Sequence, residues 1–93
     1  MSKYAAGEQR QIAEWFNDTY RKKGERYLRP VEAYEIFVGL LSPAPGSRLL
    51  DVACGIGQML KAAAPDGCEL CGVDISSVAI QAARQRLPAA GLA

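Results

Sequence analysis

Two glycines, a small residue and an acid follow a short apolar run in the middle of the chain. The run Leu49-Leu50 leads into the segment Asp51–Gly57, which reads DVACGIG. Glycines lack a β-carbon, so Gly55 and Gly57 let a ligand approach the backbone and permit the dihedral angles of a tight turn. Ala53 is small enough to serve similarly. The Asp51 carboxylate can accept a hydrogen bond, directly or through water, from an ammonium or amide group of the ligand. The segment predicts a ligand-binding loop.

A second acid, Asp74, lies 17 positions after Gly57, at the end of another apolar run. A carboxylate at such a position can accept hydrogen bonds from both hydroxyls of a ribose. Ile75 follows it and can pack against one face of an adenine ring. The two signals together indicate a ligand that contains a nucleoside.

Alternating strands and helices are expected to position these residues. The second half of the chain predicts two buried parallel strands and two helices: strands at 48–52 and 69–74, helices at 58–64 and 77–87, the last capped by Ser76 or Ser77. Residues 88–93 are expected to form a loop leading towards a further strand outside the chain. Ligands of open α/β sheets bind beyond the carboxyl ends of the strands, beside the N-terminus of the following helix, so the loop and Asp74 should lie together.

Two amphipathic helices precede this unit. The first is expected over 8–21 and the second from Pro30 to the helix-breaking segment 43–47. Their predicted buried faces consist of apolar residues at helical spacing: Ile12, Trp15, Phe16 and Tyr20 in the first, and Tyr34, Phe37, Val38 and Leu41 in the second. The order helix, helix, strand, helix, strand, helix predicts the α/β class.

The segment Leu50–Gly57 is similar to the first motif of class I S-adenosylmethionine-dependent methyltransferases, and Gly72–Ser76 resembles the second. The resemblance implies a Rossmann-like fold, with S-adenosyl-L-methionine as cofactor and S-adenosyl-L-homocysteine as product. It implies methyl transfer by the full-length enzyme to an acceptor that the sequence does not identify, most simply a small molecule. The implied cofactor-binding residues are Asp51, Ala53, Cys54, Gly55, Gly57, Asp74 and Ile75.

The resemblance also implies that residues 1–46 form a helical lid and residues 47–93 the first half of the cofactor-binding domain. Lids of this kind often place an aromatic residue or an arginine near the cofactor, which adds Tyr20, Tyr27 and Arg29 as candidates. The alternative for these three is core packing of the tyrosines and a surface position for Arg29.

The chain departs from the family in length. A class I methyltransferase has a seven-stranded sheet, and the sequence predicts only its first two strands. Two parallel strands with unpaired outer edges bury little core. We therefore expect a truncation, a proteolytic product, or a chain that completes its sheet by oligomerising.

Two other functions compete with methyl transfer. One is a non-catalytic cofactor-binding fragment or partner subunit. The other is a dinucleotide-binding protein for NAD(P) or FAD, whose fingerprint requires a third small residue where this chain has Leu60. No residue is assigned as a catalytic acid or base.

Composition argues against a nucleic-acid partner, a membrane partner and a metal site. The 93 residues fit at most one domain, and the net charge of +1 with no basic stretch beyond Arg21–Lys23 argues against a nucleic-acid partner. No signal peptide or membrane-spanning run is recognisable, which predicts a cytoplasmic protein without a membrane partner. Three cysteines, an odd number in a chain without an export signal, favour reduced thiols. The absence of histidine favours packing of Cys68 and Cys71 over a metal site.

Overall fold

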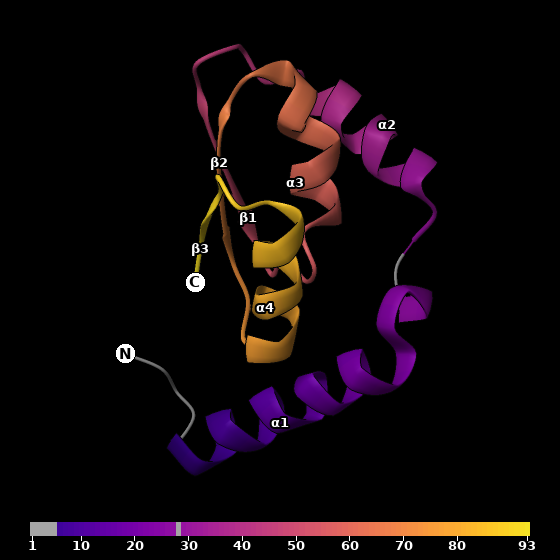
Figure 1. Cartoon of the computed structure of the whole chain (residues 1–93), viewed down its shortest axis with the longest axis vertical. Coiled ribbons are helices and arrows are strands. Elements are labelled where there is room, and N and C mark those ends of the chain that lie inside the picture. The colour runs from indigo at the N-terminus through magenta and orange to yellow at the C-terminus, as the bar shows by residue number, and fades with distance from the viewer. Residues whose placement is uncertain (1–5, 28) are drawn as a thin grey trace.

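A computed structural model describes residues 6–27 and 29–93 of the chain (Figure 1). Helices and strands follow the predicted order, with one short strand added at the end. The elements are α1 (Ala6–Lys23), the 3-10 helix η1 (Gly24–Tyr27), α2 (Val31–Leu41), β1 (Arg48–Val52), α3 (Gln58–Ala63), the 3-10 helix η2 (Ala64–Asp66), β2 (Glu69–Val73), α4 (Ser77–Arg86) and β3 (Gly91–Leu92).

The sheet is parallel and has the order β1-β2-β3. Leu49 lies opposite Leu70, and Val52 lies opposite Val73, so β1 and β2 end at the same edge. The prediction that residues 88–93 form only a loop is wrong. The free edge of β2 is paired by backbone that follows α4: Asp74 N donates to Ala93 O at 3.0 Å, and Ala93 N donates to Gly72 O at 3.0 Å. The sheet therefore continues past the second strand and its helix.

The core lies on the face of the sheet that α3 and α4 cover (Figure 1). Cys54, Leu60 and Ile80 form its centre, and leucines of β1, β2, β3 and the end of α4 pack around them. Side chains alternate along a strand, so Leu50 and Val52 point to the opposite face. They are 60% and 70% exposed, and no element among the described residues covers them. The prediction that both strands are buried is therefore wrong for this face.

The first helix, α1, packs against α4 and reaches the body of the molecule over only part of its length (Figure 1). Phe16 and Tyr20 are half-buried, whereas Trp15 is 59% exposed. Its buried polar residue, Thr19, donates to the carbonyl of Trp15 within the same helix at 2.8 Å. Of the four residues of the predicted apolar face, Phe16 and Tyr20 are therefore half-buried, whereas Ile12 and Trp15 are exposed.

The second helix, α2, packs on α3. Its C-cap is Ser42, whose N–H donates to Val38 O and whose left-handed backbone then turns the chain out of the helix. Val38 is buried as predicted, whereas Phe37 and Leu41 are exposed. Phe37 lines a cavity instead of packing in the core. None of the helices within residues 6–27 and 29–93 combines the length and the apolar character needed to span a bilayer.

Candidate functional site

The loop between β1 and α3 has an unusual backbone. Ala53, Gly55 and Gly57 all have positive φ angles, of 62°, 57° and 88°. A left-handed conformation is uncommon for a residue with a β-carbon, so Ala53 is a strained position immediately after the strand. Two hydrogen bonds hold the loop: Cys54 N donates to Val73 O at 2.9 Å, and Gly57 N donates to Cys54 O at 3.0 Å. The loop is thereby folded back over the ends of β1 and β2.

The two glycines of the loop serve different contacts. A β-carbon on Gly55 would lie 2.7 Å from the hydroxyl oxygen of Tyr20, which comes from α1. A β-carbon on Gly57 would lie 2.9 Å from Cδ1 of Leu87 and 3.4 Å from Cβ of Ala83. Gly55 therefore admits Tyr20 of α1 to the loop, whereas Gly57 allows α4 to pack against the start of α3.

Asp74 is held by the backbone on both sides of its carboxylate. Gly55 N donates to Oδ2 at 2.8 Å, and Ser76 N donates to Oδ1 at 2.8 Å. Each carboxylate oxygen has a further lone pair, so the group retains acceptor capacity for a ligand. The acid thus fixes the loop after β1 relative to the loop after β2.

Two cavities lie beside this loop and share Tyr20 and Ala53 in their walls. The first measures about 520 Å³ and is lined by polar and aromatic side chains: Tyr20, Arg29, Tyr34, Phe37, Asp51, Ala53, Cys54, Gly55, Gln58 and Met59. The second measures about 600 Å³ and is mainly apolar: Phe16, Tyr20, Val52, Ala53, Val73, Asp74 and Ile75. Together they run along the carboxyl ends of β1 and β2.

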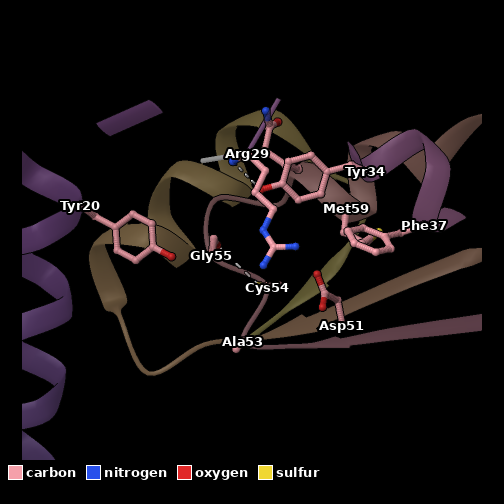
Figure 2. Close-up of a pocket in the computed structure, with 10 residues that line it drawn as sticks. Tyr20, Arg29, Tyr34, Phe37, Asp51, Ala53, Cys54, Gly55 and Met59 are labelled. Carbon is pink, nitrogen blue, oxygen red and sulfur yellow. Dashed lines mark hydrogen bonds between the residues drawn. The ribbon is translucent and has the colours of Figure 1, made fainter. Parts of the chain in front are cut away.

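Opposite charges face one another in the first cavity. Figure 2 shows the guanidinium group of Arg29 pointing toward the carboxylate of Asp51, with Tyr34 and Phe37 beside it and Tyr20 on the other side of Gly55. The Arg29 guanidinium carbon lies 5.9 Å from the centre of the Phe37 ring, and the Arg29 backbone N–H donates to the Tyr34 hydroxyl at 3.3 Å. α2 therefore orients Arg29 over the end of β1.

The site raises the pKa values of two groups. Burial, followed by the negative charge of Asp74, raises the pKa of Asp51 above 3.8. Burial, followed by the charges of Asp74 and Asp51, raises the pKa of the Cys54 thiol to about 11. Cys54 is therefore a protonated packing residue at neutral pH rather than a nucleophile. Its thiol approaches the carbonyl of Gly55 at 3.6 Å.

The structure brings most of the predicted site residues to these cavities. Asp51, Ala53, Cys54, Gly55, Tyr20 and Arg29 line the first, and Asp74 and Ile75 line the second. Gly57 lines neither, because it is buried against α4. The side chain of Tyr27 lies outside the part of the chain that the structure describes.

Several cavity residues are absent from the sequence-based set. Phe16, Tyr34 and Phe37 were predicted to pack in the core, and Gln58 and Met59 were predicted only as residues of a helix. Helical periodicity identifies the side of a helix that faces the protein but does not separate core contacts from the wall of a cavity. The one available signal was the position of Gln58 and Met59 directly after the glycine loop.

A comparison with protein families matches residues 50–93 to a methyltransferase domain. No curated protein matches the chain. The matched segment begins one residue before Asp51 and contains both the loop and Asp74. The matched segment therefore includes both sequence motifs.

Solved structures match over more of the chain. Magnesium protoporphyrin IX methyltransferase from Synechocystis, with bound S-adenosylmethionine, is 18% identical, with a TM-score of 0.72 over 99% of this chain and 56% of that one. A methyltransferase from Geobacter sulfurreducens, in complex with S-adenosylhomocysteine, is 25% identical, with a TM-score of 0.61 over 74% of this chain and 32% of that one. The [4+2]-cyclase SpnF is 21% identical, with a TM-score of 0.61 over 68% of this chain and 26% of that one.

This chain therefore spans less than two thirds of the length of each structure described above. It has the fold of the N-terminal portion of class I S-adenosylmethionine-dependent methyltransferases, as the sequence predicted. The predicted cofactor class agrees with the ligands bound in the Synechocystis and Geobacter structures.

Proposed function

We propose that this chain, with its class I methyltransferase fold, binds S-adenosylmethionine along the two cavities beside Ala53 and serves methyl transfer to a small-molecule acceptor. The observation that carries the proposal is the presence of chemistry suited to the cofactor in the two cavities beside the loop. Arg29 and Asp51 line one cavity, and Asp74 and Ile75 line the other. The segment before residue 47 serves as the lid, and residues 47–93 provide the base of the site.

The first cavity suits the amino-acid end of the cofactor. A methionine head group carries an ammonium and a carboxylate, and Asp51 and Arg29 offer one group of opposite charge for each. Partial burial strengthens such contacts because water screens them less. The raised pKa of Asp51 supports this assignment, since a nearby ammonium would offset the cost of its buried charge.

The second cavity suits the adenosine end. Asp74 keeps free lone pairs on both oxygens, which can accept from two ribose hydroxyls. Ile75, Val73 and Phe16 provide apolar surfaces on which an adenine ring can pack. Ile75 and Val73 are 47% and 38% exposed, so the surface that a ring would cover is accessible.

S-adenosylmethionine would supply the methyl group of its sulfonium: the acceptor would bond to the methyl carbon while the carbon–sulfur bond breaks, and S-adenosylhomocysteine would leave with the electron pair of that bond. The contribution of the chain is to bind, to orient and to exclude water, because positioning two reactants in line accounts for most of the acceleration in such a displacement. Tyr20 and Ala53 line both cavities and so would lie beside the middle of the cofactor. No described residue is assigned as a general base.

Calorimetric titration of the chain with S-adenosylhomocysteine tests the binding proposal. We expect saturable binding to one site, together with an upward shift of the unfolding temperature, because a ligand that binds only the folded state stabilises it. Titration with NAD⁺ is the matched comparison and should give no binding. A chain that binds NAD⁺ in preference to S-adenosylhomocysteine would contradict the proposal.

The competing function is a chain that binds the cofactor without transferring its methyl group. It is favoured by one observation: the carboxylates that line the cavities, Asp51 and Asp74, are both assigned to the cofactor. The cyclase among the similar structures also illustrates that this fold does not fix the reaction. Incubation with methyl-labelled S-adenosylmethionine and a panel of small phenols, amines, thiols and carboxylic acids separates the two, since only an enzyme yields a labelled acceptor.

A further inference from the structure

Asn17 joins the lid helix to the loop that carries Asp74. Its Oδ1 accepts from Ser76 Oγ at 2.7 Å and from Val78 N at 3.2 Å, and its Nδ2 donates to Ser77 Oγ at 3.3 Å. One side chain of α1 therefore makes three hydrogen bonds to the start of α4. Sequence patterns gave no indication of this role, because Asn17 lies among the polar residues of an amphipathic helix.

The hydrogen bond between Asn17 and Ser76 is buried at its Ser76 end. Ser76 is fully buried, and its hydroxyl accepts from Ala79 N at 3.1 Å as the N-cap of α4. A hydroxyl has a single proton to donate, and that of Ser76 goes to Asn17. Removal of the Asn17 side chain would leave this buried donor without its acceptor, which is the costly way to lose a hydrogen bond.

The same contact leads directly to the site. Ser76 N donates to Oδ1 of Asp74, so Asn17 is separated from the candidate ribose-binding acid by one residue. On α1, Asn17 is preceded by Phe16 and followed one turn later by Tyr20, and both line the cavities. The hydrogen bonds of Asn17 fix how far α1 is turned about its own axis, and this orientation places Phe16 and Tyr20 over the loop.

We propose that Asn17 is a positioning residue that latches α1 over the cofactor site and holds Ser76 and Asp74 in their binding geometry. It acts through these neighbours and lines neither cavity itself. The proposal rests on the proposed function, because it treats α1 as the lid over bound S-adenosylmethionine. The latch consists of Asn17, Ser76, Ser77 and Val78.

The latch can be measured without a ligand. In Asn17→Ala, hydrogen exchange should accelerate at the Val78 amide and throughout α1, whereas the core helix α3 should exchange as in the wild type. Asn17→Asp should restore protection, because a carboxylate accepts the same two hydrogen bonds and suits the N-terminus of α4. Gln11→Ala, at an exposed position of the same helix, is the matched control and should change nothing. Unchanged protection of Val78 and α1 in Asn17→Ala would overturn the proposal.

The effect on the cofactor is measured with S-adenosylhomocysteine. We expect Asn17→Ala to weaken its binding about tenfold and Asn17→Asp to return it to near the wild-type value. Trp15, the only tryptophan, meets the Phe16 ring edge to face at 4.9 Å between ring centres, so its fluorescence should respond to the ligand in the wild type and less in Asn17→Ala. Wild-type affinity in a variant with a loosened α1 would overturn the positioning role.

Two outcomes keep the latch and the proposed function apart. If the wild type binds no S-adenosylhomocysteine, the proposed function fails, and with it the role of the latch in positioning a cofactor, while the exchange measurement still decides whether Asn17 holds α1. If Asn17→Ala does not fold, Ser77→Ala replaces it. That variant removes one bond of the latch at an exposed position and should give the same changes at a smaller size.

Discussion

The backbone N–H of Gly55 donates a hydrogen bond of 2.8 Å to Oδ2 of Asp74, which joins the loop after β1 to the acid that follows β2. Ser76 N holds the other carboxylate oxygen at the same distance. Asp74 is therefore a structural brace as well as a candidate ligand. A substitution at this position should affect stability and binding together, and the two effects can be measured separately.

Asp74→Asn should weaken both. The carboxamide has only one acceptor oxygen, so its NH₂ group would face a backbone N–H that also donates. We expect the free energy of unfolding to fall by about 1–3 kcal/mol and the affinity for S-adenosylhomocysteine to fall about tenfold or more. Denaturant unfolding and calorimetric titration measure the two effects. Asp66→Asn, in η2 at the other end of the strands, is the control, and an unchanged affinity in Asp74→Asn would remove Asp74 from the site.

Gly55→Ala should destabilise the chain and displace Tyr20 of α1. The backbone at Gly55 has a φ of 57°, and the new methyl group would lie 2.7 Å from the Tyr20 hydroxyl. The left-handed conformation alone costs an L-residue about 1–2 kcal/mol, and displacement of Tyr20 adds to it.

Gly39→Ala is the matched control for this substitution. Gly39 lies within α2, and a β-carbon there would meet nothing within 4 Å. The same change should therefore stabilise by about 0.5–1 kcal/mol, since alanine is the better helix former. Denaturant unfolding of both variants measures the difference, and equal effects would contradict the role assigned to Gly55.

The helices, the two longer strands and the glycine loop after β1 could be predicted because their signals are local. The pattern Asp51–Gly57 and the turn at 43–47 lie within short stretches of sequence, and helices 6–23, 31–41 and 77–86 begin and end close to the expected residues. The short strand β3 could not be predicted, since Gly91 and Leu92 become a strand only by pairing with β2.

The contacts that α1 and α2 make with the rest of the molecule were also beyond prediction. Asn17 and Ser76 are 59 positions apart, and an asparagine among polar helical residues gives no sign of a distant partner. Phe16 and Phe37 belong to apolar helical faces, and the same periodicity describes residues that fill a core and residues that border a cavity. Tertiary packing decides between these roles.

Arg29→Ala should weaken binding of the amino-acid end of the cofactor and leave binding of its adenosine end unchanged. Arg29 lines only the first cavity, so its loss should weaken S-adenosylhomocysteine about tenfold through one charged contact and leave the affinity for adenosine unchanged. Calorimetric titration with both ligands tests this. Arg26→Ala, an exposed arginine of η1, is the control. An equal loss of affinity for both ligands would indicate that Arg29 supports the lid as a whole instead of binding the amino-acid end.

Asp51→Asn should make the ligand-free chain more stable at neutral pH and a poorer binder. Burial and the charge of Asp74 raise the pKa of Asp51 in the folded state above 3.8, so the folded chain holds this proton more tightly than the unfolded chain does. The stabilisation that this proton brings is complete below pH 3.8 and is lost as the pH rises through the raised value. When Asp51 is ionised, the wild type therefore carries a half-buried charge that the variant lacks.

The stability difference between the two proteins isolates Asp51 from the other carboxylates, which titrate in both. Unfolding free energies measured from pH 3 to pH 8 should show the advantage of Asp51→Asn growing as the pH rises above 3.8 and then becoming constant. Titration with S-adenosylhomocysteine at pH 7 should show weaker binding, because the amide cannot balance an ammonium. A difference in stability that is independent of pH would contradict the raised pKa, whereas unchanged binding would place the ammonium elsewhere. In that case Asp51 would lower the stability of the ligand-free chain without contributing to binding. The pH dependence of stability and the affinity for S-adenosylhomocysteine together decide whether the destabilising carboxylate binds the cofactor.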